Sequence, residues 1–202
     1  MSTTMLVRPA REHLAGYVDA LQRGWSPNTM RPEAAQEELA QIAADPDAFL
    51  ALMDDPEARG GPVTLPDGSQ VTRLPGLRRW LWDGGGNGEG DRAFVGSINL
   101  RWQAGTAELP AHVLGHIGYN VVPWKRRQGH ATRGLALLLD EARRIGLPWV
   151  ELTTDPDNTA SQRVIEANRG RLVERFEKGA AYGGAPGLRY RIDLAGSEPH
   201  AR

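Results

Sequence analysis

The chain has 202 residues with a formal net charge of -1 at pH 7, and 40% of its residues are hydrophobic and 24% charged, as in ordinary globular proteins. A net charge this close to zero argues against binding nucleic acid or a membrane through overall charge, so any anion site must be local. The absence of cysteine excludes disulfides, thiolate metal sites and a cysteine nucleophile. No apolar stretch reaches the roughly 20 residues of a membrane span, and the N-terminus lacks a signal-peptide core. We therefore expect a cytoplasmic protein with one domain over residues 1–195 and a frayed tail over 196–202.

The first part of the chain predicts one strand followed by three helices. Apolar residues at helical spacing and helix-forming composition identify the helices. Asp45 is the expected N-cap of the third helix, with Pro46 at its first position. The expected elements are a strand over 5–10 and helices over 11–24, over 31–45 and from 46 onward.

The middle of the chain predicts strands and turns. The sequence LPDGS at 65–69 is typical of a hairpin turn. The segments 78–83 and 92–102 alternate like strands, and GGGNGEG at 84–90 lies between them. A glycine-rich nucleotide loop leads into a helix, whereas a strand follows here, so we interpret the glycine run as a hairpin connection.

The last part of the chain alternates strands and helices. Two helices are expected, the first with Ala131, Leu135, Leu138, Leu139, Ala142 and Ile145 on its inner face and the second with Ala160, Val164 and Ala167. The expected elements are strands over 114–123, 147–154, 171–177 and 187–194 and helices over 131–146 and 158–170. This order predicts an α/β (α+β) fold, a mixed and mostly antiparallel twisted sheet with helices on both faces, rather than a doubly wound nucleotide fold.

The stretch KRRQGHATRG at 125–134 indicates an anion site. A strand ends at Pro123 and a helix begins near Gly129, so the loop between them can aim unpaired backbone N–H groups at one point. Gly129 leaves room for an anion beside the backbone. Cations are unfavourable at a helix N-terminus unless an anion is present. Four cations surround the N-terminus of this helix: Lys125, Arg126, Arg127 and Arg133. We interpret the stretch as a phosphate-binding loop, and a solvated basic turn is the alternative.

The segment Arg126-Arg127-Gln128-Gly129-His130-Ala131 resembles the Arg/Gln-x-x-Gly-x-Gly/Ala loop of the GNAT N-acetyltransferase superfamily, and Asn158 with Ser161 matches its Asn-x-x-Ala/Ser pattern. The resemblance runs from about His116 to Phe176. It implies a single acetyltransferase-like domain in which the fourth strand, 116–122, splays from the fifth, 149–154. It also implies transfer of an acetyl group from acetyl-CoA directly to a primary amine of a small molecule or peptide, and a possible homodimer. A non-catalytic acyl-CoA-binding or regulatory module of the same fold is the alternative.

The resemblance further implies which residues contact acetyl-CoA. The backbone amides of 128–132 would hold the pyrophosphate, and the pantetheine arm would pair with the fourth strand and with Asn158. Capping of the next helix, assisted by Ser161, also explains Asn158. The His130 side chain is expected to contact the anion or to be exposed. The implied cofactor-binding residues are Tyr119, Asn120, Val121, Val122, Arg126, Arg127, Gln128, Gly129, His130, Ala131, Thr132, Asn158 and Ser161.

Acetyl transfer to an amine requires removal of a proton, and His116, beside the expected cleft, is the candidate base because imidazole titrates near neutral pH. A structural histidine bonded to a neighbouring strand is the alternative. Many relatives carry a tyrosine seven residues after the asparagine that protonates the leaving thiolate, but here that residue is Ile165. The proton would then come from water or from another tyrosine, or the thiolate would leave unassisted. The tyrosines considered are Tyr119, Tyr182 and Tyr190.

Tryptophans mark the predicted strands before the basic loop. Trp80 and Trp82 stand at alternate positions of one strand and therefore share one face of the sheet. Core packing explains such a pair, and an aromatic wall for the amine acceptor is the alternative.

Overall fold

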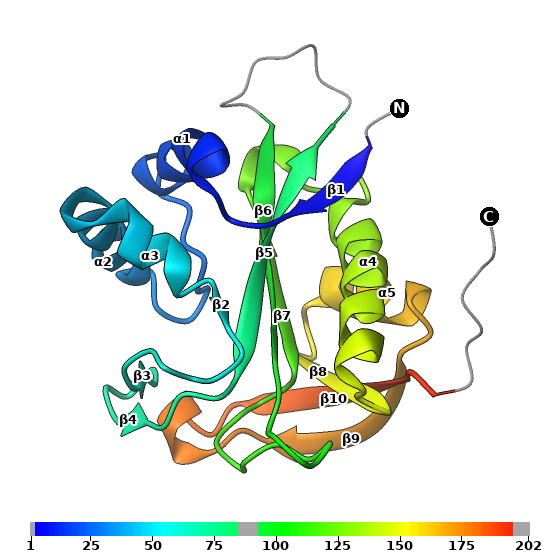
Figure 1. The fold of residues 1–202 in the computed structure, drawn as a ribbon. Helices are drawn as coiled ribbons and strands as arrows, with labels where there is room; N and C mark the ends of the chain where they lie inside the picture. Colours follow the sequence, from blue (N-terminus) through cyan, green and yellow to red (C-terminus); the bar gives the residue numbers. More distant parts are fainter. Residues whose placement is uncertain (1–2, 85–92, 196–202) are drawn as a thin grey trace.

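The computed structural model of the protein describes residues 3–84 and 93–195 (Figure 1). The chain forms a five-stranded sheet and a three-stranded sheet, with a two-stranded hairpin beside them. Every strand pairing in the described ranges is antiparallel. The larger sheet has helices on both faces (Figure 1), so the predicted fold class is confirmed.

The larger sheet has the strand order β1-β5-β6-β7, with β2 also paired to β5, and the smaller sheet has the order β8-β10-β9. The strands of the larger sheet are β1 (Thr4–Val7), β2 (Asp54–Asp55), β5 (Gly76–Asp83), β6 (Phe94–Arg101) and β7 (Ile117–Val121). Those of the smaller sheet are β8 (Trp149–Thr154), β9 (Arg171–Glu177) and β10 (Pro186–Asp193). The helices are α1 (Arg11–Gln22), α2 (Ala34–Ala44), α3 (Pro46–Ala51), α4 (His130–Ile145) and α5 (Thr159–Ala167).

Local sequence signals place several of these boundaries. Asp45 caps α3, because its Oδ1 accepts hydrogen bonds from the N–H groups of Asp47 and Ala48, both at 3.0 Å. The predicted LPDGS turn joins β3 (Val63–Thr64) to β4 (Gln70–Val71). Both expectations are therefore confirmed by the local hydrogen bonding.

The strands on either side of the glycine run pair with each other, as a hairpin requires. β5 and β6 are antiparallel, and the N–H of Asp83 donates to the carbonyl of Ala93 at 2.8 Å. Residues 85–92 lie outside the described residues, so the connection over 84–90 stays a prediction. The strand pairing agrees with the interpretation that this run is not followed by a helix.

Helix α4 packs against one face of the larger sheet, and α1, α2 and α3 lie toward the other (Figure 1). The buried face of α4 carries Leu135, Leu138, Leu139 and Ala142, as predicted, while Ile145 is exposed. On the opposite face, the ring of Trp80 stacks on Tyr17 of α1 with centroids 4.5 Å apart. Trp80 is fully buried, which matches the core-packing interpretation of this residue.

The orientation of α5 differs from the prediction. Ala160 and Ala167 are exposed, and Ile165 is the fully buried residue of this helix. Gly170 makes this possible, because a Cβ at that position would lie 2.3 Å from Cγ2 of Ile165. The prediction that residues 160, 164 and 167 form the inner face of this helix was wrong. The large aliphatic side chain of Ile165 determines which face turns to the core.

Candidate functional site

The site begins where the two sheets meet. The N–H of His116, just before β7, donates to the carbonyl of Glu151 in β8 at 2.7 Å. Gly115 allows this approach, because a Cβ there would lie 2.9 Å from the Glu151 carbonyl oxygen. Beyond this contact, β7 and β8 belong to different sheets and share no ladder in the described residues. The two strands therefore diverge from a vertex at His116, which gives the predicted splay.

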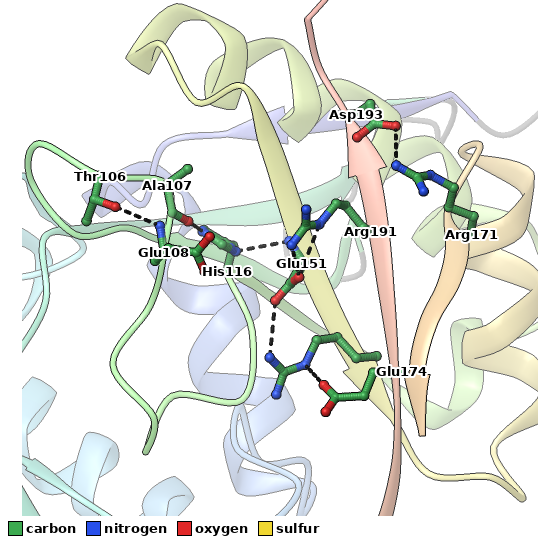
Figure 2. Close-up of polar contacts among 10 residues, drawn as sticks. Thr106, Ala107, Glu108, His116, Glu151, Arg171, Glu174, Arg191 and Asp193 are labelled. Atoms are coloured by element: carbon green, nitrogen blue, oxygen red, sulfur yellow. Dashed lines mark hydrogen bonds and ion pairs between the residues drawn. The ribbon is translucent and has the colours of Figure 1, made fainter. Parts of the chain in front are cut away.

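His116 holds this vertex with its side chain as well as its backbone (Figure 2). Its Nδ1 accepts from the N–H of Glu151 at 3.0 Å, and its Nε2 lies 3.0 Å from the carbonyl of Ala107 and donates to it. The residue is 1% exposed, and burial lowers the pKa of the imidazole. A neutral ring with both nitrogens engaged has no free position to accept a proton from an amine. The geometry thus matches the alternative of a structural histidine bonded to a neighbouring strand.

The edge of β7 that faces the gap presents backbone groups that are not paired with another strand. Hydrogen bonds of an antiparallel pair involve alternate residues. The His116 carbonyl accepts from Arg101, and the Val122 N–H donates to Val95 at 2.9 Å, so the even-numbered residues face β6. The backbone groups of Tyr119 and Val121 consequently face the gap.

This alternation corrects the predicted set of arm-binding residues. The backbone of Val122 is already bonded to β6 and is not available to a ligand in the gap. The backbone of Asn120 also faces β6, and its side-chain Nδ2 donates to the carbonyl of Ser26 at 2.7 Å. Asn120 therefore fastens the segment after α1 to β7.

The basic loop lies at the open end of the gap, between β7 and α4. Among the described residues, the backbone N–H groups of 127–132 have no hydrogen-bond acceptor, because the first helical bond to the loop is that of Arg133 to Gly129. Arg127 and Gly129 have left-handed backbone angles, with φ of 61° and 78°. Left-handed residues next to right-handed ones turn successive N–H groups toward one point and form an anion-binding concavity. The loop and the N-terminus of α4 together form such a site.

The cations around this loop have different partners in the protein. Lys125 pairs with Asp83 at 3.3 Å, and Arg133 bends back so that its Nη2 donates to the Gln128 carbonyl at 2.6 Å. Arg126 donates from Nε to the Val121 carbonyl at 3.1 Å, while Arg127 is exposed. Lys125 and Arg133 thus have protein partners, so a missing anion is not required to explain them.

The side chain of His130 corrects another expectation. It is 1% exposed, and its Nδ1 lies 2.9 Å from Oγ1 of Thr4 in β1. Burial lowers the pKa of this imidazole, and the nearby Arg133 lowers it further. The imidazole turns inward because β1 packs against the first turn of α4. Only the backbone N–H of His130 remains part of the anion site.

On the other side of the gap, Asn158 and Ser161 begin α5. Oδ1 of Asn158 accepts from the N–H of Ser161 at 3.0 Å, so Asn158 is the helix N-cap. Tyr119 reaches across from β7, with its Oη 2.8 Å from Oγ of Ser161. Burial raises the pKa of Tyr119 to about 12, so its hydroxyl is protonated at neutral pH.

The other two tyrosines considered as proton donors have different surroundings. The hydroxyl of Tyr182 donates to the carbonyl of His112 at 3.0 Å, and Tyr190 is buried in the core of the smaller sheet. A residue that the sequence did not indicate lies nearer the gap, at the end of β8. Thr154 is buried, and its Oγ1 has no hydrogen-bond partner in the described part of the chain. Since buried hydroxyls are normally bonded, Thr154 is a candidate ligand contact.

The gap opens into a cavity of about 1140 Å³ that extends from the basic loop to α2 and the strands β5 to β7. Polar side chains line its inner wall. Arg78 donates to Glu38 at 2.9 Å and to Oη of Tyr17 at 3.2 Å, and Arg101 donates to Oδ1 of Asn99 at 2.8 Å. Sequence reasoning missed these residues. The available signal was the alternation of polar residues with apolar ones in β6, which places Asn99 and Arg101 on one sheet face. Arg78 stands next to Arg79 in β5 and had no such signal.

The sequence matches the family model of the acetyltransferase (GNAT) domain over residues 5–171. The chain belongs to the GNAT acetyltransferase family. The anion loop, the splayed strands and the capping asparagine described above are therefore parts of a GNAT domain. No curated protein sequence matches the chain.

Solved structures of acetyltransferases share this GNAT fold. RimL, a ribosomal alpha-N-protein acetyltransferase in complex with coenzyme A, is 12% identical with a TM-score of 0.59, and the match covers 96% of each chain. The microcin self-immunity acetyltransferase MccE, in complex with acetyl-CoA and AMP, is 12% identical with a TM-score of 0.57. That match covers 94% of this chain and 92% of MccE. None of the described helices is long and apolar enough to cross a membrane.

Proposed function

We propose that this GNAT protein transfers the acetyl group of acetyl-CoA directly to a primary amine of a small molecule or peptide. The observation that carries the proposal is the group of acceptor-free N–H groups of 127–132 at the open end of the gap between β7 and β8. A diphosphate suits this site because it is anionic and accepts several hydrogen bonds at once. The similar structures of RimL and MccE hold coenzyme A and acetyl-CoA, which supports the same co-substrate here.

In this proposal the pantetheine arm lies between the splayed strands. Its amide groups pair with the backbone of Tyr119 and with the N–H of Val121, because the Val121 carbonyl already accepts from Arg126. Nδ2 of Asn158 remains free to donate while Oδ1 caps α5, so capping and ligand binding are compatible. The unpartnered hydroxyl of Thr154 offers a further contact. The arm thereby places the thioester between β7 and the polar wall of the cavity.

The reaction proceeds by attack of a neutral amine on the thioester carbonyl. The N–C bond forms, the carbonyl oxygen takes up negative charge, and a backbone N–H of β7 stabilises it. The C–S bond then breaks, the amine proton leaves to water, and the thiolate receives a proton. Tyr119 supplies that proton in our proposal and regains one from water, because its hydroxyl is protonated at neutral pH and lies in the gap beside Ser161. This assignment replaces the tyrosine that many relatives have at the position of Ile165.

His116 has a positioning role in this scheme rather than a proton-transfer role. Its two ring nitrogens hold β8 and the segment near Ala107 at the vertex of the gap. Free alkylamines have a pKa of roughly 10, so a small neutral fraction is present at neutral pH and turnover is expected to rise with pH.

Measurements of thiol release and of acetyl-CoA binding together distinguish catalysis from binding alone. Release of free thiol from acetyl-CoA is measured with a panel of amines, and acetyl-CoA binding is measured separately by calorimetry. We expect binding in the absence of an amine and amine-dependent thiol release. Tight binding without release for any amine would instead support the non-catalytic alternative.

We also propose that the protein forms a homodimer through β9. This edge strand of the smaller sheet has Leu172 and Val173 on opposite faces, each 41% exposed. An edge strand has unpaired N–H and C=O groups that can pair with another chain, and these two apolar side chains would be covered in such a pair. Light scattering should give twice the chain mass for the wild type and the monomer mass for Val173→Lys. A monomeric wild type at micromolar concentration would contradict the proposal.

A further inference from the structure

We propose that the amine acceptor carries a carboxylate that binds the guanidinium of Arg101, so that the acceptor is an amino acid. This inference rests on the proposed acetyl transfer and specifies its acceptor. Three observations carry it: the position of Arg101, its lack of a carboxylate partner, and the charge of its surroundings.

Arg101 lines the cavity beside β7. It is the last residue of β6, and its Nη2 is 2.8 Å from Oδ1 of Asn99 on the same strand. A Cβ placed on Gly118 of β7 would lie 3.5 Å from this Nη2, so the guanidinium lies over Gly118. The residue after Gly118 is Tyr119, whose backbone faces the thioester in our proposal. The guanidinium therefore lies beside the same stretch of β7 that the thioester faces in our proposal.

Arg101 differs from the other arginines in this sheet. Arg78 forms an ion pair with Glu38 at 2.9 Å, and Arg79 pairs with both Asp54 and Glu141 at 2.6 and 2.7 Å. No aspartate or glutamate of the described ranges, 3–84 and 93–195, forms an ion pair with Arg101. A partly buried guanidinium normally has such a partner, because an unpaired charge is costly to remove from water.

Among the described residues, the charged side chain that acts on Arg101 is the cation Arg78, and the Tyr182 hydroxyl is a further polar neighbour. Burial lowers the pKa of its guanidinium, and the nearby positive charge of Arg78 lowers it further. Glu38 already neutralises Arg78 through their ion pair, so this wall of the cavity carries one uncompensated positive charge. A carboxylate supplies one negative charge and two oxygens that fit the planar fork of an arginine.

The spacing also restricts the acceptor. The amine must reach the thioester carbonyl next to Tyr119 while the carboxylate reaches the guanidinium over Gly118. An acceptor whose amine and carboxylate are separated by only a few bonds can make both contacts. An amino acid meets this requirement, whereas a long diamine has no group to pair with Arg101. Recognition by a charged hydrogen bond would discriminate strongly against a neutral analogue.

The test compares each free amino acid with its carboxamide, which has the same amine and side chain but no negative charge. Thiol release gives kcat/KM for both members of each pair. The wild type should prefer the acid by about tenfold to a hundredfold, which is the loss expected when a charged hydrogen bond is removed. Arg101→Gln should remove this preference while retaining turnover of the carboxamide, and Arg101→Lys should restore part of it. Arg144→Gln, on the exposed end of α4, is the matched control and should keep the full preference.

The inference is overturned by a wild type that acetylates acid and carboxamide equally. It is also overturned by an acid preference that survives in Arg101→Gln. An aminoalkyl phosphate forms a third arm of the panel, and its faster acetylation would overturn the assignment of a carboxylate. Unchanged acetyl-CoA affinity and melting temperature in Arg101→Gln show that the variant folds.

A binding measurement keeps the inference separate from the proposed reaction. N-acetyl amino acids and their carboxamides are titrated into the protein by calorimetry in the presence of coenzyme A. Tighter binding of the acid, lost in Arg101→Gln, supports the carboxylate site even if no amine is acetylated. Equal binding of both compounds overturns it, whereas an absence of turnover with every amine refutes only the proposed reaction.

Discussion

Replacement of Gly129 by alanine tests the anion loop most directly. Gly129 has φ of 78°, and an added Cβ would lie 2.7 Å from Nη1 of Arg133. The left-handed backbone costs an alanine about 1–2 kcal/mol, and the contact also displaces the Arg133 guanidinium. Relaxation of the loop relieves both effects but turns N–H groups of 127–132 away from their common point. We therefore expect a loss of affinity for acetyl-CoA in addition to a loss of stability.

The magnitude follows from the number of hydrogen bonds affected. A hydrogen bond to a charged group contributes about 1.5–3 kcal/mol, and each 1.4 kcal/mol changes an equilibrium constant tenfold. Misalignment of one N–H group should thus raise the Kd for acetyl-CoA by about tenfold to a hundredfold. Isothermal titration calorimetry measures the Kd, and urea denaturation measures the free energy of unfolding.

Gly146→Ala is the matched control at the other end of the same helix. Gly146 has φ of 93°, and an added Cβ would have no atom within 4 Å. It should therefore lose a similar amount of stability, about 1–2 kcal/mol, with an unchanged Kd. Wild-type affinity in Gly129→Ala, or an equal loss of affinity in both glycine variants, would refute the assignment of the loop as the pyrophosphate site.

The remaining predictions concern Tyr119 and His116. Tyr119→Phe should lower kcat by about tenfold to a hundredfold with little change in the Kd for acetyl-CoA, because general acid catalysis is lost while the backbone contacts remain. An unchanged rate of acetyl transfer in a single-turnover assay would exclude Tyr119 as the acid. His116→Ala should lower the free energy of unfolding by about 2–4 kcal/mol, since it leaves the buried N–H of Glu151 without an acceptor and creates a cavity. Its activity relative to wild type should be constant between pH 7 and 9, whereas recovery at high pH would indicate a base. Burial lowers the pKa of His116 in the folded state, so the unfolded state binds more protons below about pH 6.5 and wild-type stability should fall as the pH drops through this range. The melting temperature of His116→Gln should depend less on pH than that of the wild type. An identical pH dependence would contradict the assignment of a neutral, buried imidazole.

Local sequence signals determined much of the fold and the position of the anion loop. The apolar spacing of α4 depends only on residues three or four apart, and its buried face was predicted apart from Ile145. The same applies to Asp45 as the N-cap of α3, to the hairpin turn at 65–69 and to the strand that precedes the basic loop. Gly129 was identified near the start of the helix because it leaves room for an anion beside the backbone, and the structure adds that its backbone is left-handed.

The tertiary structure alone decided which partners the functional side chains have. His116 bonds to Glu151, 35 residues later, and His130 bonds to Thr4, which lies 126 residues earlier. Arg101 and Arg78 both belong to strands of the larger sheet, yet of these two only Arg78 meets a carboxylate among the described residues, because α2 brings Glu38 to it. Secondary structure follows from spacing within a few residues, whereas burial, protonation and pairing depend on contacts between distant segments. The sequence therefore indicated acetyl-CoA as the co-substrate, and only the arrangement of the sheets suggested what the acceptor carries.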